Sequence, residues 1–139
     1  MLCAALADLT GSVEPLQALA EAIAELPRCS FFEIVLERVE NPCSAAFISI
    51  NLEEDPVGSD DAISREMDDI MQGIGLSPPA MVKAHAILND LVAVRNRLHP
   101  QAVPGHTLGS VDTIFDIIGP LDLLDDAGLS GCPVYSTPP

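Results

Sequence analysis

A change in hydrophobic periodicity at Phe31 constrains the fold of this chain more than any other feature. Before it, apolar residues recur at the spacing of a helix. From Phe31 onward, FFEIVLERVE (31–40) and SAAFISINLEE (44–54) alternate with the period of two that a half-buried strand requires. Asn41-Pro42 separates these runs as a turn, so we expect an antiparallel hairpin. The side chains expected on one face are Phe32, Ile34, Leu36 and Arg38 of the first run and Ala46, Ile48 and Ile50 of the second.

Segments with helical periodicity surround the hairpin, and turn or capping residues mark their ends. Pro120 interrupts the last of them, so we expect a kink or a free carbonyl acceptor near Gly119. The expected helices cover 1–9, 12–26 with Ser12 as N-cap, 62–74 with a cap among 59–61, 79–98, and 110–128 with Ser110 as N-cap and Gly128 at the C-cap. The inward faces are expected at Leu16, Leu19, Ala20 and Ile23, at Met67, Ile70, Met71 and Ile74, and at Val111, Ile114, Ile118 and Leu121.

The length of the chain fits one domain. A domain of 139 residues buries about two thirds of the surface that its unfolded chain exposes. Aromatic residues make up only 4% of the sequence, so aliphatic side chains must fill the core. Residues 134–136 are expected to form a brief terminal strand. The prediction for residues 1–139 is therefore a single-domain α/β sandwich, in which the hairpin and the terminal strand form a small mixed sheet covered by about four helices.

The charge of the chain is strongly negative. With 21 acidic and 6 basic residues its formal net charge is −15, and such a surface repels the phosphates of nucleic acids. We therefore do not expect the protein to bind nucleic acid. The same field attracts divalent cations, although it selects no metal. A surface kept acidic for solubility or for high salt is the favoured explanation of the charge, since Lys83 is the only lysine.

The cysteines and the N-terminal residues indicate a cytoplasmic protein. Cys3, Cys29, Cys43 and Cys132 are widely scattered and form no CxxC pair, which favours reduced, structural thiols. Residues 1–9 lack the basic start of a signal peptide, and no apolar run is long enough to span a membrane. We therefore expect a cytoplasmic protein without a membrane partner.

The stretch GHTLGSVDTIFDIIG (105–119) is the most distinctive part of the sequence. Asp112 and Asp116 are four residues apart and lie on one face of the expected helix, where like charges repel each other. A bound cation would remove that repulsion, and His106 could add an imidazole to give an N,O,O ligand set for nickel or zinc. Without a metal, Asp112 is favourable in the first helical turn, Asp116 is solvated and His106 is a hydrogen-bond partner in the loop.

This stretch resembles a signature of the nickel insertion protein (LarC) family, H-E-x-G-x-x-D-x-I-x-D-I-x-G. Thr107 departs from it, because the family has glutamate at that position. The resemblance continues at Gly128-Leu129, where the family has Leu-Gly, and over 134–138, where the family has V-Y-A-S-P. The residues that match the signature are His106, Gly109, Asp112, Ile114, Asp116, Ile117 and Gly119.

The resemblance implies a function and its partners. Proteins of this family insert nickel into a pyridinium bisthiocarboxylate mononucleotide, in a cyclometallation that consumes CTP, and the product serves lactate racemase and its relatives. The expected partners are therefore a divalent metal and the pyridinium mononucleotide precursor, with His106, Asp112 and Asp116 as metal ligands.

The chain also departs from the family pattern. The family's opening strand and loop, D-x-x-x-G-x-x-G-D, would precede Met1, and its CTP-binding portion is expected in a further domain. The family's histidine-rich insert is replaced by the acidic residues 53–69. We therefore expect an amino-terminal domain of the family, truncated at both ends. If the protein begins at Met1, the missing first strand leaves a sheet edge or apolar groove open, and we predict that a homo-oligomer covers it.

A second interpretation is an interaction or assembly domain without metal affinity. In that case the same residues only stabilise the junction between loop and helix, and catalysis belongs elsewhere. Under either interpretation we expect His85 to be a polar or half-buried helical residue and His99 to cap a helix end. No phosphate-binding glycine motif and no Ser/His/Asp order supports an unrelated enzyme class.

Overall fold

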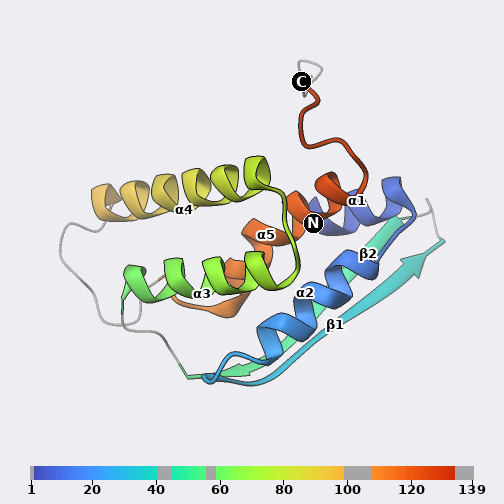
Figure 1. The fold of residues 1–139 in the computed structure, drawn as a ribbon. Helices are drawn as coiled ribbons and strands as arrows, with labels where there is room; N and C mark the ends of the chain where they lie inside the picture. The colour runs from blue at the N-terminus through green and yellow to red at the C-terminus, as the bar shows by residue number, and fades with distance from the viewer. Residues whose placement is uncertain (1, 41–44, 56–58, 99–107, 134–139) are drawn as a thin grey trace.

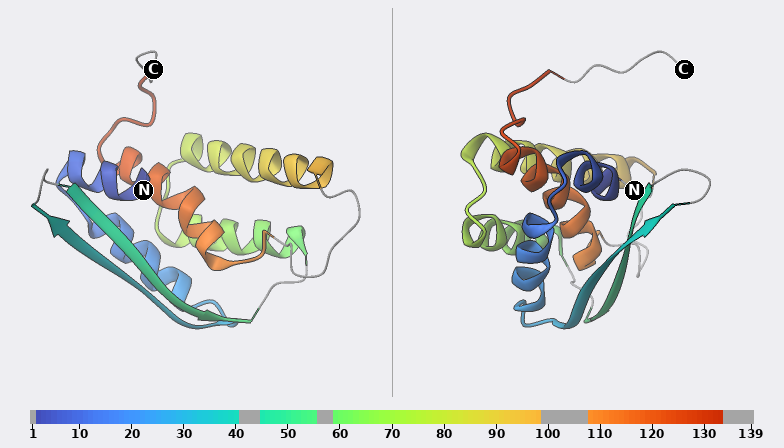
Figure 2. Two further views of the ribbon diagram at one scale, coloured as in Figure 1. Left: turned by 180° about the vertical axis from the view of Figure 1, so that it is seen from behind. Right: turned by 90° about the vertical axis from the view of Figure 1, so that its right-hand side faces the viewer.

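Two long antiparallel strands form one side of the domain, and the described helices all lie on one face of them (Figures 1 and 2). The computed structural model describes residues 2–40, 45–55, 59–98 and 108–133. Its elements are α1 (Leu2–Thr10), α2 (Glu14–Ala24), β1 (Cys29–Val39), β2 (Ala45–Glu54), α3 (Asp60–Gly73), α4 (Pro78–Leu98) and α5 (Val111–Asp126). The predicted α/β class is confirmed, and each of the five helical ranges expected from the sequence corresponds to a described helix.

The register of the hairpin confirms the predicted faces. Ile34 lies opposite Ile50, and Leu36 lies opposite Ile48. Ile34, Ile48 and Ile50 pack against the helices, so their face is the inner one. In the described residues the sheet has these two antiparallel strands. The expected terminal strand at 134–136 lies outside the described residues, so the mixed sheet stays a prediction.

Helix α2 begins differently from the prediction. Its N-cap is Val13, not Ser12, and no side chain caps the backbone there. Ser12 Oγ instead donates to Glu14 Oε2 at 2.6 Å, and the Val13 N–H donates to the same oxygen at 3.1 Å. The carboxylate of Glu14 therefore takes the place of the serine hydroxyl as acceptor. The predicted inward face is confirmed, because Leu16, Leu19, Ala20 and Ile23 are all buried.

Helices α3 and α4 form a second layer beyond α5 (Figure 1). Ser59 caps α3 by accepting from the Ala62 N–H at 3.4 Å, as predicted. Met67, Ile70 and Met71 are buried, as expected, and Ile74 packs at the border of the core. Helix α4 contributes the buried residues Ala80, Ala84 and Leu88 to this layer. Arg95 near the end of α4 binds Asp60 at the start of α3 through two contacts of 2.5 and 2.6 Å.

Helix α5 runs through the middle of the domain and supplies much of its core. Val111, Ile114 and Ile118 are fully buried, and Leu121 is half-buried. Each fully buried aliphatic side chain of this size contributes roughly 1.5–3 kcal/mol. The helix continues through Pro120 to Asp126, so the proline does not end it. Because proline has no N–H, the Asp116 carbonyl lacks its usual helical donor, as the sequence predicted.

None of the helices in the described ranges has the length and apolar composition needed to cross a membrane.

Candidate functional site

The two predicted carboxylate ligands lie at the start of α5. Asp112 is in its first turn and Asp116 follows one turn later, and both side chains are exposed. Their neighbours Val111, Ile114 and Phe115 are buried, so the hydrophobic face fixes the direction of the acidic face. The helix therefore presents Asp112 and Asp116 together to solvent. His106 lies outside the described residues, and its place beside them stays a prediction.

A carboxylate from the hairpin holds the start of α5. The Val111 N–H donates to Glu54 Oε2 at 3.0 Å, and Ser110 Oγ donates to Glu54 Oε1. Ser110 is the N-cap residue, as predicted, but its side chain makes no capping bond to the helix backbone. Glu54 therefore performs the capping, and its negative charge lies at the positive end of the helix.

An arginine holds Glu54 in turn. Arg28 pairs with Glu54 and also contacts Glu66 of α3, with Nη2 and Oε2 2.8 Å apart. The side chains of Arg28 and Glu54 are each only 11% exposed. Burial alone would lower the pKa of Arg28, but the hydrogen bonds and charges of Glu66 and Glu54 outweigh it and raise that pKa. This network joins the hairpin, α3 and α5 at the end of the domain that carries Asp112.

The other end of the signature packs against α1 and α2. Gly119 has no side chain, and a Cβ added there would lie 3.0 Å from Cys3 Sγ and 3.2 Å from Leu16 Cδ2. Glycine is therefore needed for the close approach of α5 to both helices. The ring of Phe115 lies 5.7 Å from that of Phe32, which fixes α5 against the sheet. The close packing of α5 against α1 and α2 thus explains why position 119 is a glycine.

Cys3 lies beside this contact and is not a thiolate at neutral pH. Burial, followed by the negative charge of Asp116, raises the pKa of the Cys3 thiol to about 11. Burial also raises the pKa of Cys29. Both side chains are buried in the core, and a protonated thiol is a poor nucleophile, so we interpret these two cysteines as structural thiols. Cys132 is exposed, and Cys43 lies outside the described residues.

A second acidic group at the end of α5 was not predicted. Burial, with the charges of Asp126 and Asp125, raises the pKa of Asp122 to about 6. Asp125 has a structural partner, because its Oδ2 accepts from the Ser77 N–H at 2.8 Å and its Oδ1 from Ser77 Oγ at 2.7 Å. These bonds join the start of α4 to the end of α5. The sequence pattern could have shown Asp122 and Asp126 as a second pair four residues apart.

His85 has the role that the sequence predicted. It is half-buried on α4, and its Nε2 lies 2.8 Å from Asp68 Oδ1 of α3. His99 lies outside the described residues. Among the described residues, no group of three or more His, Cys, Asp and Glu side chains could hold a metal ion by itself. The predicted metal site at Asp112 and Asp116 would therefore need a further donor, and it stays a prediction.

The comparison with known protein families finds one family that this chain matches. The sequence matches the family model described as nickel insertion protein over residues 1–139. No curated protein and no solved structure matches it at a significant level. The family match covers the whole chain, including the α5 signature described above, and agrees with the resemblance seen in the sequence. The chain belongs to the nickel insertion protein family.

Proposed function

We propose that this chain takes part in inserting nickel into the pyridinium bisthiocarboxylate mononucleotide precursor, with Asp112 and Asp116 as carboxylate ligands of the incoming ion. The observation that carries the proposal is the presentation of both carboxylates on one exposed face of α5 in a nickel insertion protein. A divalent ion between them would remove their mutual repulsion. The net charge of −15 would also raise the local concentration of cations.

The ligand set suits an ion that must leave again. Carboxylate oxygens are harder and weaker ligands for nickel than imidazole or sulfur. Nickel held by Asp112 and Asp116 would therefore exchange readily and pass to the softer sulfur atoms of the thiocarboxylates. His106 is the proposed third ligand. The CTP dependence that the family resemblance implies stays a prediction.

The carboxylates also provide a base for the chemical step. Cyclometallation replaces a ring C–H bond of the precursor by a nickel–carbon bond and releases one proton. Once nickel has moved to the precursor, the carboxylate of Asp112 or Asp116 is free to accept that proton. One pair of side chains can thus serve first as metal ligand and then as base.

Calorimetric titration with nickel tests the first part of this proposal. We expect the chain to bind Ni²⁺ and the Asp112→Asn/Asp116→Asn variant to lose that binding while keeping its circular dichroism spectrum. Asp122→Asn/Asp126→Asn is the matched control, because it removes the same charge at the same spacing from the same helix. Equal loss of binding in both variants would show that nickel is attracted by the overall negative charge and is not bound at a specific site.

The second candidate is an interaction or assembly domain without metal affinity. It is favoured by the lack of a three-ligand cluster among the described residues. A wild-type chain that binds no nickel in the titration would establish this alternative over the first. Formation of a homo-oligomer and residence in the cytoplasm, both expected from the sequence, stay proposals under either function.

A further inference from the structure

Helix α4 lies on the side of the domain away from the sheet (Figures 1 and 2). Its buried face, at Ala80, Ala84 and Leu88, packs into the core. A second row of large apolar side chains on the same helix is exposed, namely Ile87 by 39%, Leu91 by 38%, Val94 by 42% and Leu98 by 66%. We call these four residues the α4 stripe. An exposed row of this kind marks a surface that another protein can cover.

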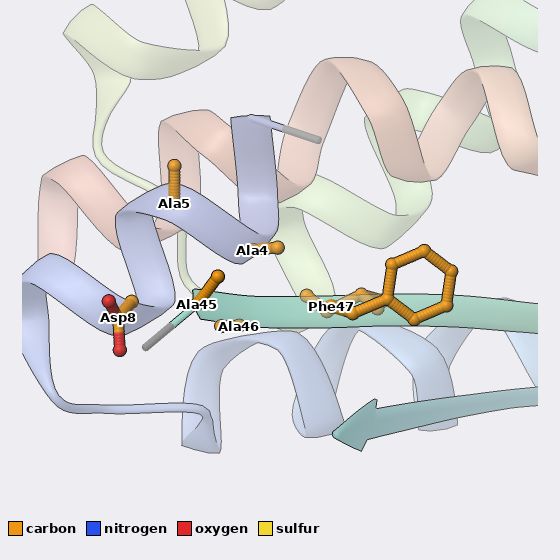
Figure 3. A pocket seen from close by; sticks show the side chains of 7 residues that line it. Ala4, Ala5, Asp8, Ala45, Ala46 and Phe47 are labelled. Atoms are coloured by element: carbon orange, nitrogen blue, oxygen red, sulfur yellow. The ribbon is translucent and has the colours of Figure 1, made fainter. Parts of the chain in front are cut away.

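An apolar groove elsewhere in the domain has other expected occupants. It lies between α1 and β2 and is lined by Ala4, Ala5 and Asp8 and by residues 45–48 (Figure 3). The family resemblance implies a further strand before Met1, and residues 134–136 are expected to form another strand of this sheet. Strands added to the sheet would lie on the far side of the domain from α4. They can therefore fill this groove but leave the α4 stripe uncovered.

The spacing of the α4 stripe is that of a seam between two helices. Its members are separated by four, three and four residues, as are the apolar a and d positions of a coiled coil. Side chains at this spacing form one line along a helix and pack into the gaps of a facing helix. Val82 is also exposed on α4, but it lies five residues before Ile87 and therefore points away from the seam. The pattern thus calls for a second helix.

The charge of α4 favours the approach of a second acidic chain. The helix carries three basic residues, Lys83, Arg95 and Arg97, and one acidic residue, Asp90, so its net charge is +2 with His85 neutral. Each of the other described helices and strands has a net negative charge. Two copies of a chain whose net charge is −15 therefore repel each other least where their α4 helices meet.

We propose that two copies of the chain associate through the α4 stripe, with their α4 helices antiparallel and a two-fold axis between Leu91 and Val94. Leu91 then packs on the partner's Val94, and Ile87 packs on the partner's Leu98. The same contacts are repeated on the other side of the axis. The interface is therefore self-complementary, as a two-fold dimer requires.

The charges beside the stripe determine the direction of the two helices. Asp90 and Arg97 are exposed and flank the stripe on one side. An antiparallel pair brings the Asp90 of each copy next to the partner's Arg97, which gives two ion pairs across the interface. A parallel pair would bring Asp90 next to the partner's Arg95 instead, and Arg95 already binds Asp60 in its own chain. The antiparallel pair therefore uses the free charges.

Sedimentation equilibrium over a range of chain concentrations measures this association. Stable protein interfaces bury about 1,200–2,000 Å² in total, and one helical segment from each copy, residues 87–98, buries less. We therefore expect a weak dimer, with a dissociation constant on the order of 10–100 µM. The data should fit a monomer–dimer equilibrium, because a two-fold contact closes on itself.

Two matched variants locate the interface on α4. Leu91→Lys places a charge in the seam, so we expect its dissociation constant to rise about tenfold or more. Val82→Lys adds the same charge to the same helix outside the seam, at a position that is 69% exposed. We expect it to dimerise like the wild type. Circular dichroism checks that both variants fold, and Val94→Lys replaces Leu91→Lys if the latter does not.

Reversal of the flanking charges tests the direction of the helices. Asp90→Arg and Arg97→Asp each place like charges next to each other twice in the dimer, so each should raise the dissociation constant about threefold to tenfold. The double variant Asp90→Arg/Arg97→Asp restores both ion pairs and has the same net charge as the wild type. Its dissociation constant should return to within about twofold of the wild-type value.

Three results would overturn the proposal. The first is a wild-type chain that stays monomeric at millimolar concentration, which would leave the α4 stripe to another part of the protein or to a different partner. The second is a folded Leu91→Lys or Val94→Lys variant that dimerises as well as Val82→Lys. The third is a double charge reversal that dimerises no better than the single reversals.

Discussion

At the residue scale, the missing side chain of Gly119 sets the distance between α5 and its neighbours. Cys3 and Leu16 occupy the space that a Cβ would need, and Leu16 is almost fully buried. A tightly packed core adjusts only partly to an added methyl group. The glycine of the α5 signature is therefore a packing residue, whereas the two aspartates of the signature are exposed.

Gly119→Ala should lower the free energy of unfolding by about 1–3 kcal/mol, because the added methyl group overfills this contact. Chemical denaturation monitored by circular dichroism measures the change. Gly73→Ala is the control, since Gly73 is also helical and nothing lies within 4 Å of an added Cβ. That substitution should be neutral or stabilising by up to about 1 kcal/mol. Equal effects at the two positions would contradict the packing role of Gly119.

Asp122 gives the stability of the domain a pH dependence. Its folded pKa of about 6 lies above the ordinary value of 3.8, so the folded state holds the proton more tightly than the unfolded state. The stabilisation is complete below pH 3.8 and is lost as the pH rises through 6. Asp122→Asn should therefore be more stable than the wild type above that pH, by up to about 1–2 kcal/mol after allowance for solvent screening.

The measurement for Asp122 is denaturant unfolding of wild type and variant across this pH range. Asp69→Asn, at an exposed position on α3, controls for the loss of one negative charge. The gain of the Asp122 variant should shrink as the pH falls toward 4. A gain that does not change with pH would show that the titration of Asp122 is not its cause.

At the element scale, the start of α5 depends on a side chain of the hairpin. The Ser110 hydroxyl and the Val111 N–H both donate to Glu54, and Arg28 pairs with the same carboxylate. The sequence predicted the range of α5 and its N-cap from local signals. It did not predict Glu54, because that residue is 56 positions from Ser110 and only tertiary packing brings the two together.

Glu54→Gln should destabilise the domain by about 2–3 kcal/mol, because it leaves Arg28 with Glu66 alone and weakens the cap of α5. The substitution should also accelerate amide hydrogen exchange more at Val111 and Asp112 than at the end of the helix. The neighbouring Glu53→Gln is the control, since Glu53 is exposed. Its effect should stay within about 0.5 kcal/mol. Unchanged exchange at the start of α5 in the Glu54 variant would refute the capping role.

At the scale of the whole molecule, alternating and helical patterns predicted the hairpin, its inner face and most helix ranges. These features depend on local burial, which a single sequence displays directly. The ion network at Arg28, the close contact at Gly119 and the groove at β2 depend on how the elements meet, and no local pattern encodes that. Of the predicted ligands, Asp112 and Asp116 lie together on α5, and His106 lies outside the described residues.

The most direct test of nickel binding at the start of α5 is an NMR titration with paramagnetic Ni²⁺ below equimolar amounts. We expect the amide signals from Asp112 to Asp116 to broaden first, while those from Asp122 to Asp126 on the same helix stay sharp. Broadening that begins at Asp122–Asp126, or spreads evenly over the acidic surface, would contradict it.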